Sequence, residues 1–309
     1  MHAEISTLFS LGGMSEIPVR EAHIGGGLHI EECNREWLDA VRTQCPKVAA
    51  RELLEFAPPY THRFFLAGKG ANPERVSERE KQPFFQATVL SRIVKPTSIP
   101  FDNVWVTSSY PDYGEVRHHS DFWVNGLSVA FLSEDEGGNT ITSNDAIRIA
   151  ELWESFRFLL DNEPDYRRIV RAIKSYEFAH YIYWAEQNHS AMHAALESLV
   201  YFGPKENGAQ ITKRLPLLLP DLVTGVQAEA IYQLHNDFKH EAQPLQQITT
   251  PDGTLAESDR RRSESVSLLR KCVRELLLRA ISDQTFAQIL CDHNLMKEHY
   301  GVTTGQGIM

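Results

Sequence analysis

Residues 143–160 read SNDAIRIAELWESFRFLL, and this stretch marks the change from mixed to helical sequence. Ser143, Asn144 and Asp145 are residue types that cap the N-terminus of helices. After them, apolar side chains recur at the spacing of one helix face, at Ile149, Leu152, Trp153, Phe156, Leu159 and Leu160. The stretch therefore predicts an amphipathic helix that opens a helical region.

Amphipathic sequence continues toward the C-terminus. Residues 164–202 contain no Gly or Pro after Pro164, which predicts either one long bent helix or two helices that break at Asn188-His189-Ser190. Further helices are predicted at 209–219, at 226–238 and, as the last strong one, at 257–281. Helices joined by short connections bury their apolar stripes against one another, so residues 143–309 are predicted to form an all-α bundle.

Residues 1–142 indicate a mixed α/β domain instead. Aromatic and β-branched residues predict strands at 62–66, 104–110 and 122–132, and Gly25-Gly26-Gly27 predicts a turn between two short strands. The other expected segments are a helix at 36–56, a polar loop at 67–82 and a linker at 134–139. The predicted fold class is an α+β N-terminal region followed by an all-α helical bundle, with the domain boundary between residues 142 and 143.

Bulk properties narrow the classes of protein. A length of 309 residues suits two domains, and 42% hydrophobic with 23% charged residues is typical of globular proteins. The net charge of -10 argues against a general polyanion binder but leaves room for a local basic patch. Four cysteines without a CxxC pair favour reduced thiols in a cytoplasmic protein. No apolar run is long enough for a membrane span, and no nucleotide-loop signature predicts a cofactor.

Three segments carry a resemblance to a known family: HAALESLVYFG at 193–203, ITKRLPLLL at 211–219 and IYQLHNDFKH at 231–240. With the helix order around them, they resemble the HEPN superfamily (higher eukaryotes and prokaryotes nucleotide-binding), closest to its Apea-like branch. The resemblance spans roughly residues 145–285. It implies a helical bundle that commonly works as a homodimer, with the motif of each chain lining a shared cleft.

Many members of this superfamily are metal-independent endoribonucleases with an Arg, four to six residues and then a His. The resemblance places His240 at the motif His and Asn236 at the polar residue beside the Arg, while His235 stands where the Arg is expected. It implies that His240 acts as acid or base, that Asn236 positions the substrate and that His235 makes a phosphate contact. The predicted function is an RNA-cleaving protein of a bacterial antiviral defence or toxin-like system, whose N-terminal domain senses a trigger or binds a protein partner.

The chemistry fits these residue types. Attack of a 2′-hydroxyl on the neighbouring phosphate needs a base, an acid and positive charge on the phosphate. A histidine near its ordinary pKa supplies acid or base, whereas arginine is the stronger phosphate clamp. Five positions on a regular helix correspond to about 140° of rotation, so His235 and His240 would not touch unless the helix ended near Phe238 or a second subunit contributed.

A basic segment and one glutamate each have two possible interpretations. Arg270, Lys271 and Arg274 make the last predicted helix locally basic, which suits RNA phosphates or a solvated helix face. Glu197 either orients the histidine region or lies at the surface.

Two other functions are also open. The same cleft of a non-catalytic module would bind nucleotide, nucleic acid or a protein. A metal-dependent hydrolase would use His118, His119 and Asp121, although a polar turn explains those residues more simply and no metal is predicted.

Overall fold

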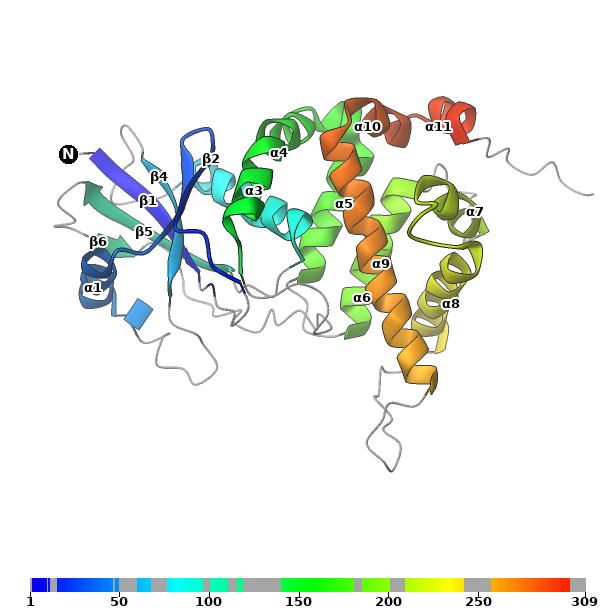
Figure 1. The fold of residues 1–309 in the computed structure, drawn as a ribbon, viewed down its shortest axis with the longest axis horizontal. Coiled ribbons are helices and arrows are strands. Elements are labelled where there is room, and N and C mark those ends of the chain that lie inside the picture. The colour runs from blue at the N-terminus through cyan, green and yellow to red at the C-terminus, as the bar shows by residue number, and fades with distance from the viewer. Residues whose placement is uncertain are drawn as a thin grey trace, which may run out of the picture. The chain divides into compact units, whose positions relative to one another are not determined.

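The computed structural model describes residues 2–9, 11, 16–46, 48–49, 60–67, 77–96, 101–110, 116–118, 140–180, 185–200, 209–241 and 257–300. The chain divides into two compact units, Met1–Arg157 and Phe158–Met309. An antiparallel sheet belongs to the first unit and the second is helical (Figure 1), so the predicted order of an α+β region before a helical region is confirmed. The predicted domain boundary and the HEPN assignment stay predictions.

The sheet of the first unit has the strand order β2-β3-β4-β1-β5-β6. Each neighbouring pair is antiparallel. The strands are β1 (His2–Phe9), β2 (Glu21–Gly25), β3 (Leu28–Glu32), β4 (His62–Ala67), β5 (Phe101–Tyr110) and β6 (Val116–His118). The predictions at 62–66 and 104–110 are confirmed by β4 and β5, whereas the segments 122–132 and 134–139 lie outside the described residues. Strand β1 was not expected, although it pairs with both β4 and β5.

The predicted glycine turn connects β2 and β3. Gly25, Gly26 and Gly27 all have positive φ, a conformation that costs other residues energy. Gly25 also packs against Trp153, since a Cβ atom there would lie 2.2 Å from Cδ1 of the indole. The hairpin therefore needs glycine both for its backbone and for its contact with α4.

Helix α1 (Arg35–Gln44) begins where the helix at 36–56 was expected. The side chain of Asn34 accepts a hydrogen bond from the backbone N–H of Glu36, which caps the helix, and Cys45 ends it. Trp37, Leu38 and Val41 form a buried cluster with apolar residues of the sheet that include Leu8, Val106 and Val116. The predicted continuation to residue 56 lies mostly outside the described residues.

Helix α3 (Glu78–Val94) replaces the end of the predicted polar loop, so the loop prediction is wrong from residue 78 onward. The cause is a capping box: Ser77 accepts from the N–H of Glu80, and the Glu80 carboxylate accepts from the N–H of Ser77. Such a box starts a helix in polar sequence, where no apolar stripe announces it. The buried side of α3 includes Phe84, Ala87, Leu90 and Ile93.

A buried ion network ties three strands of the sheet together. The guanidinium of Arg63 on β4 bonds to Glu4 of β1 and donates to Glu31 of β3 through Nε at 2.7 Å. It also lies over the Trp37 ring, 4.2 Å from the ring centroid. Burial alone would lower the pKa of Arg63, but the two carboxylates raise it, so the group stays charged in the interior.

Helix α4 (Ser143–Asp161) forms as expected, but its cap differs from the prediction. Thr142, not one of residues 143–145, is the N-cap: its hydroxyl accepts from the N–H of Asp145 at 3.3 Å. The carboxylate of Asp145 in turn accepts from the N–H of Thr142 at 2.8 Å. The reason is that Asp145 sits three residues after Thr142, the spacing of a reciprocal cap. Of the predicted stripe, all members are buried except the half-buried Leu160.

The second unit holds helices α5 (Glu163–His180), α6 (Ala185–Val200), α7 (Ala209–Leu218), α8 (Gly225–Glu241), α9 (Glu257–Ser282), α10 (Gln284–Cys291) and α11 (His293–Tyr300) (Figure 1). Both readings of residues 164–202 are wrong, because α5 ends at His180 and residues 188–190 lie inside α6. Helices α7, α8 and α9 confirm the predicted segments. The short helices α10 and α11 were missed.

The helix at 226–238 has an apolar stripe of Val226, Ala230, Ile231, Leu234 and Phe238, which predicts its buried face, and this prediction is partly wrong. Ile231 and Leu234 are buried as expected, but Val226 is 82% exposed and Ala230 is also exposed. The buried face instead includes Ala228, which is not part of the predicted stripe. No helix among the described residues is both long and apolar enough to span a membrane. None of the four cysteines, all of which are among the described residues, forms a disulfide.

We expect Gly25→Ala to destabilise the first unit more than Gly26→Ala does. Alanine at Gly26 incurs only left-handed backbone strain, about 1–2 kcal/mol, because its nearest contact would be 3.4 Å away. Alanine at Gly25 adds a clash with Trp153 that costs about 1–3 kcal/mol more. Urea unfolding followed by tryptophan fluorescence measures both variants. Equal losses of stability would show that the hairpin does not pack on Trp153.

Candidate functional site

Helix α6 carries polar side chains into the interior of the second unit. His189, His193 and Glu197 follow one another at intervals of four residues, which places them along one face of the helix. Both histidines are completely buried. Helix α6 packs against α8 and α9, the two helices that carry the residues predicted to act on or bind RNA.

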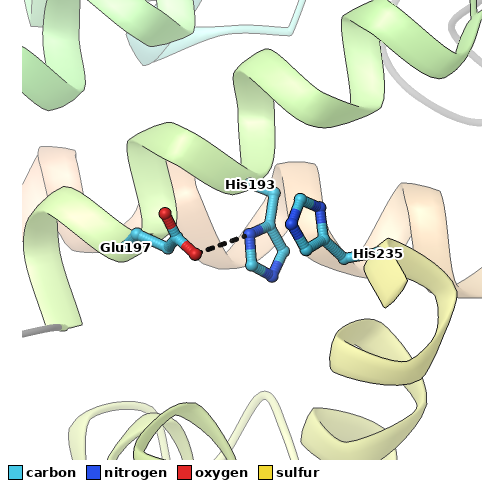
Figure 2. A group of neighbouring side chains, drawn as sticks. All are labelled: His193, Glu197 and His235. Carbon is cyan, nitrogen blue, oxygen red and sulfur yellow. Dashed lines mark ion pairs between the residues drawn. The ribbon is translucent and has the colours of Figure 1, made fainter. Parts of the chain in front are cut away.

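The centre of the site is a stacked pair of imidazoles from two helices. The rings of His193 on α6 and His235 on α8 lie parallel within 4°, with their centroids 3.6 Å apart (Figure 2). His235 itself is half-buried. Two imidazoles stacked at this distance repel each other strongly if both are protonated.

Glu197 supplies the negative charge of the site. Its Oε1 atom lies 3.4 Å from Nδ1 of His193, one helical turn away (Figure 2), and its side chain is 39% exposed. Burial would raise the pKa of Glu197, but contact with His193 and the nearby His235 outweigh burial and hold the pKa below its usual value. The carboxylate is therefore ionised at neutral pH and favours a proton on the imidazole pair.

His189 lies behind the stacked pair. Its ring centroid is 6.3 Å from those of His193 and His235, and 4.9 Å from the ring of Phe238. Neither of its ring nitrogens has a hydrogen-bond partner among the residues that the structure describes. Burial, followed by the positive potential of His193, His235 and Arg270, lowers the pKa of His189 to about 3. His189 is consequently neutral and adds no charge to the site.

Arg270, predicted to bind nucleic acid, has a structural contact. Its Nη2 donates to Oδ1 of Asn188 on α6 at 2.9 Å, and the Nδ2 of that amide donates to the carbonyl of Ala179 on α5 at 2.5 Å. This chain of bonds joins three helices. Lys271 is exposed and Arg274 is half-buried on the same helix. The RNA contact of these three residues stays a prediction. RNA that bound Arg270 would contact a guanidinium that already donates to Asn188.

The remaining predicted catalytic residues lie toward the end of α8. Asn236 is half-buried there, whereas the side chain of His240 lies outside the described residues. Helix α8 does not end near Phe238 but continues to Glu241, so His235 and His240 are separated by about 140° on one regular helix. The structure brings His235 to His193 and Glu197 instead.

His193 and His189 were not predicted as site residues. A signal was present, because His189, His193 and Glu197 share the spacing of one helix face. The apolar residues between them obscured this spacing, and His189 was interpreted as part of a helix break. Glu197 lies beside a histidine, which was one of its two predicted placements.

The donor atoms of His193, Glu197 and His235 also form a potential metal-ligand set. One ligand atom from each lies within 4.8 Å of the others, the one such group of His, Cys, Asp or Glu side chains among the described residues. The alternative set predicted at residues 118–121 cannot be judged, because only the backbone of His118, in β6, is described there.

No family model, curated protein or solved structure matches the chain.

We expect the second unit to lose stability as the pH falls from 7.5 to 5. Unfolded histidine titrates near 6.5, whereas folded His189 titrates near 3, so protons bind the unfolded chain first. The contribution of His189 is complete above pH 6.5 and falls by about 2 kcal/mol at pH 5. In His189→Gln this part of the pH dependence should disappear, as measured by urea unfolding with circular dichroism in EDTA.

The matched control is His299→Gln, which removes an exposed histidine of α11. Its pH profile should follow that of the unmodified protein. A His189→Gln profile as steep as the control's would contradict the assignment of a neutral, buried imidazole at this position.

Proposed function

We propose that residues 143–309 form a HEPN-like domain that cleaves RNA without a metal ion, in a cytoplasmic bacterial defence or toxin-like system. The observation that carries this proposal is the stacking of His235 on His193, with Glu197 beside them. His235 occupies the position at which the HEPN motif has an arginine. The ionised carboxylate of Glu197 favours positive charge on the imidazole pair, which supplies part of the phosphate contact that arginine would make.

The remaining roles follow from α8. His240 transfers the proton to or from the reacting oxygens, and Asn236, four positions before it, positions the substrate from the same helix face. Because His235 points toward α6 and lies about 140° from His240, one copy of the helix does not present all three groups to one phosphate. A homodimer that brings two copies of α8 to a shared groove would complete the site. The first unit then serves as sensor or partner-binding module.

A non-catalytic module that binds nucleotide, nucleic acid or protein is the second candidate. The complete burial of His193 favours it, because an imidazole without solvent access exchanges protons with substrate only through its neighbour. The replacement of the motif arginine by His235 also favours a non-catalytic module.

Cleavage of mixed RNAs by the purified full-length chain in EDTA should depend on His240. We expect His240→Ala to reduce the cleavage rate by at least about 100-fold, since loss of a general acid or base has that effect. His299→Ala, which removes the exposed histidine of α11, serves as the control and should retain full activity. Equal RNA degradation by His240→Ala and the unmodified chain would exclude the ribonuclease assignment.

Restoring the motif separates the two candidates. His235→Arg places a permanent positive charge at the phosphate position, so a ribonuclease should cleave RNA faster at pH 8 than the unmodified chain. A binding module should gain no cleavage. The comparison is made on gel-resolved RNA products with folding checked by circular dichroism.

A further inference from the structure

We propose that His193, Glu197 and His235 form a binding site for a divalent transition-metal ion of the Zn²⁺ class. Two imidazoles and one carboxylate are the donors that such ions take in proteins, and three protein ligands leave a position for water. One donor atom from each side chain lies within 4.8 Å of the other two. The site belongs to α6 and α8 alone, two helices that pack against each other.

The buried ring nitrogens of His193 support this metal site. His193 is completely buried, and neither of its ring nitrogens makes a hydrogen bond with the described residues. Nδ1 lies 3.4 Å from the carboxylate of Glu197. A buried polar group without a hydrogen bond costs on the order of 1–3 kcal/mol. Coordination of a cation would satisfy the lone pair of a neutral imidazole.

The spacing of the three ligands also supports the metal site. His193 and Glu197 are separated by four residues on α6, a spacing at which two side chains of one helix face reach the same ion. His235 approaches from α8 (Figure 2). The stacked rings are parallel, so their in-plane lone pairs do not yet converge on one point. Binding of one ion by both histidines therefore requires their rings to turn about the Cβ–Cγ bonds.

The surrounding charges determine which ion fits. Lys239 and Arg270 place positive charge near the site, and Glu197 is its only carboxylate ligand. Hard ions such as Mg²⁺ and Ca²⁺ bind oxygen-rich sites with several negative charges, so they fit poorly here. Ions that bond strongly to imidazole nitrogen, Zn²⁺ among them, fit the two histidines.

Metal binding would have a consequence for RNA cleavage, and this consequence rests on the proposed function. An ion that holds the lone pairs of His193 and His235 removes both imidazoles from phosphate contact. The ion would therefore inhibit the nuclease, and a chelator would restore it.

The test is a titration of the EDTA-stripped full-length chain with ZnCl₂ by isothermal calorimetry, repeated with MgCl₂. We expect one Zn²⁺ per chain at this site and no Mg²⁺ binding. Glu197→Gln and His235→Gln should each weaken Zn²⁺ binding by at least about 10-fold, because loss of a ligand costs no less than loss of a supporting contact. Neither variant removes a completely buried side chain, so both are expected to fold, and circular dichroism checks this.

The controls are Glu298→Gln and His299→Gln, which remove the same donor types from the exposed surface of α11. Both should bind Zn²⁺ as the unmodified chain does. Titration with CoCl₂ adds a spectroscopic signature: visible absorption without a thiolate charge-transfer band supports histidine and carboxylate ligands, and such a band would assign the ion to cysteines.

Unchanged Zn²⁺ affinity in Glu197→Gln and His235→Gln, or no binding to the unmodified chain, would overturn the metal site. Neither result bears on cleavage, since the ribonuclease assay is carried out in EDTA. Conversely, a chain that binds Zn²⁺ but cleaves no RNA would retain the metal site and lose the proposed function.

Discussion

The burial of imidazoles on one face of α6 is the constraint around which the second unit is arranged. His189 and His193 are completely removed from solvent without hydrogen bonds to the described residues. Burial disfavours the charged form of His189, which lowers its pKa to about 3. The neighbouring helices accommodate this face with an aromatic edge from Phe238, a stacked ring from His235 and the bond between Arg270 and Asn188. Apolar side chains would pack there at lower cost.

The first unit shows how the same chain treats a buried charge that has only a structural role. Arg63 is as deeply buried as the histidines, yet it meets two carboxylates and an aromatic ring. Its bonding capacity is used and the strands β1, β3 and β4 are held together. The contrast is informative because buried polar groups in folded proteins are normally satisfied. By contrast, the ring nitrogens of His189 and His193 on α6 make no hydrogen bonds with the described residues. These nitrogens are therefore available to a ligand.

Glu197 connects the two kinds of chemistry that the site supports. Its ionised carboxylate can stabilise a proton shared by His193 and His235, or it can become the oxygen ligand of a metal ion bound by the same rings. The two uses exclude each other, since one lone pair cannot hold a proton and a metal ion at once. A single cluster would thus give either an RNA-contacting site or a metal-occupied one, and the ion concentration would decide between them.

Local patterns in the sequence were sufficient to predict most of the helices. The stripe from Ile149 to Leu159 and the segments that became α7, α8 and α9 could be recognised because residues four apart share a helix face whatever surrounds them. The hairpin at Gly25 was equally local. Local patterns failed where long-range packing decides: β1 is defined by pairing with β4 and β5, and Val226 is exposed although it fits an apolar stripe. The contact of His193 with His235 joins two helices far apart in the chain. Only the packing of α6 against α8 turns separate histidines and Glu197 into one site, because side-chain distances between helices are a property of the tertiary structure.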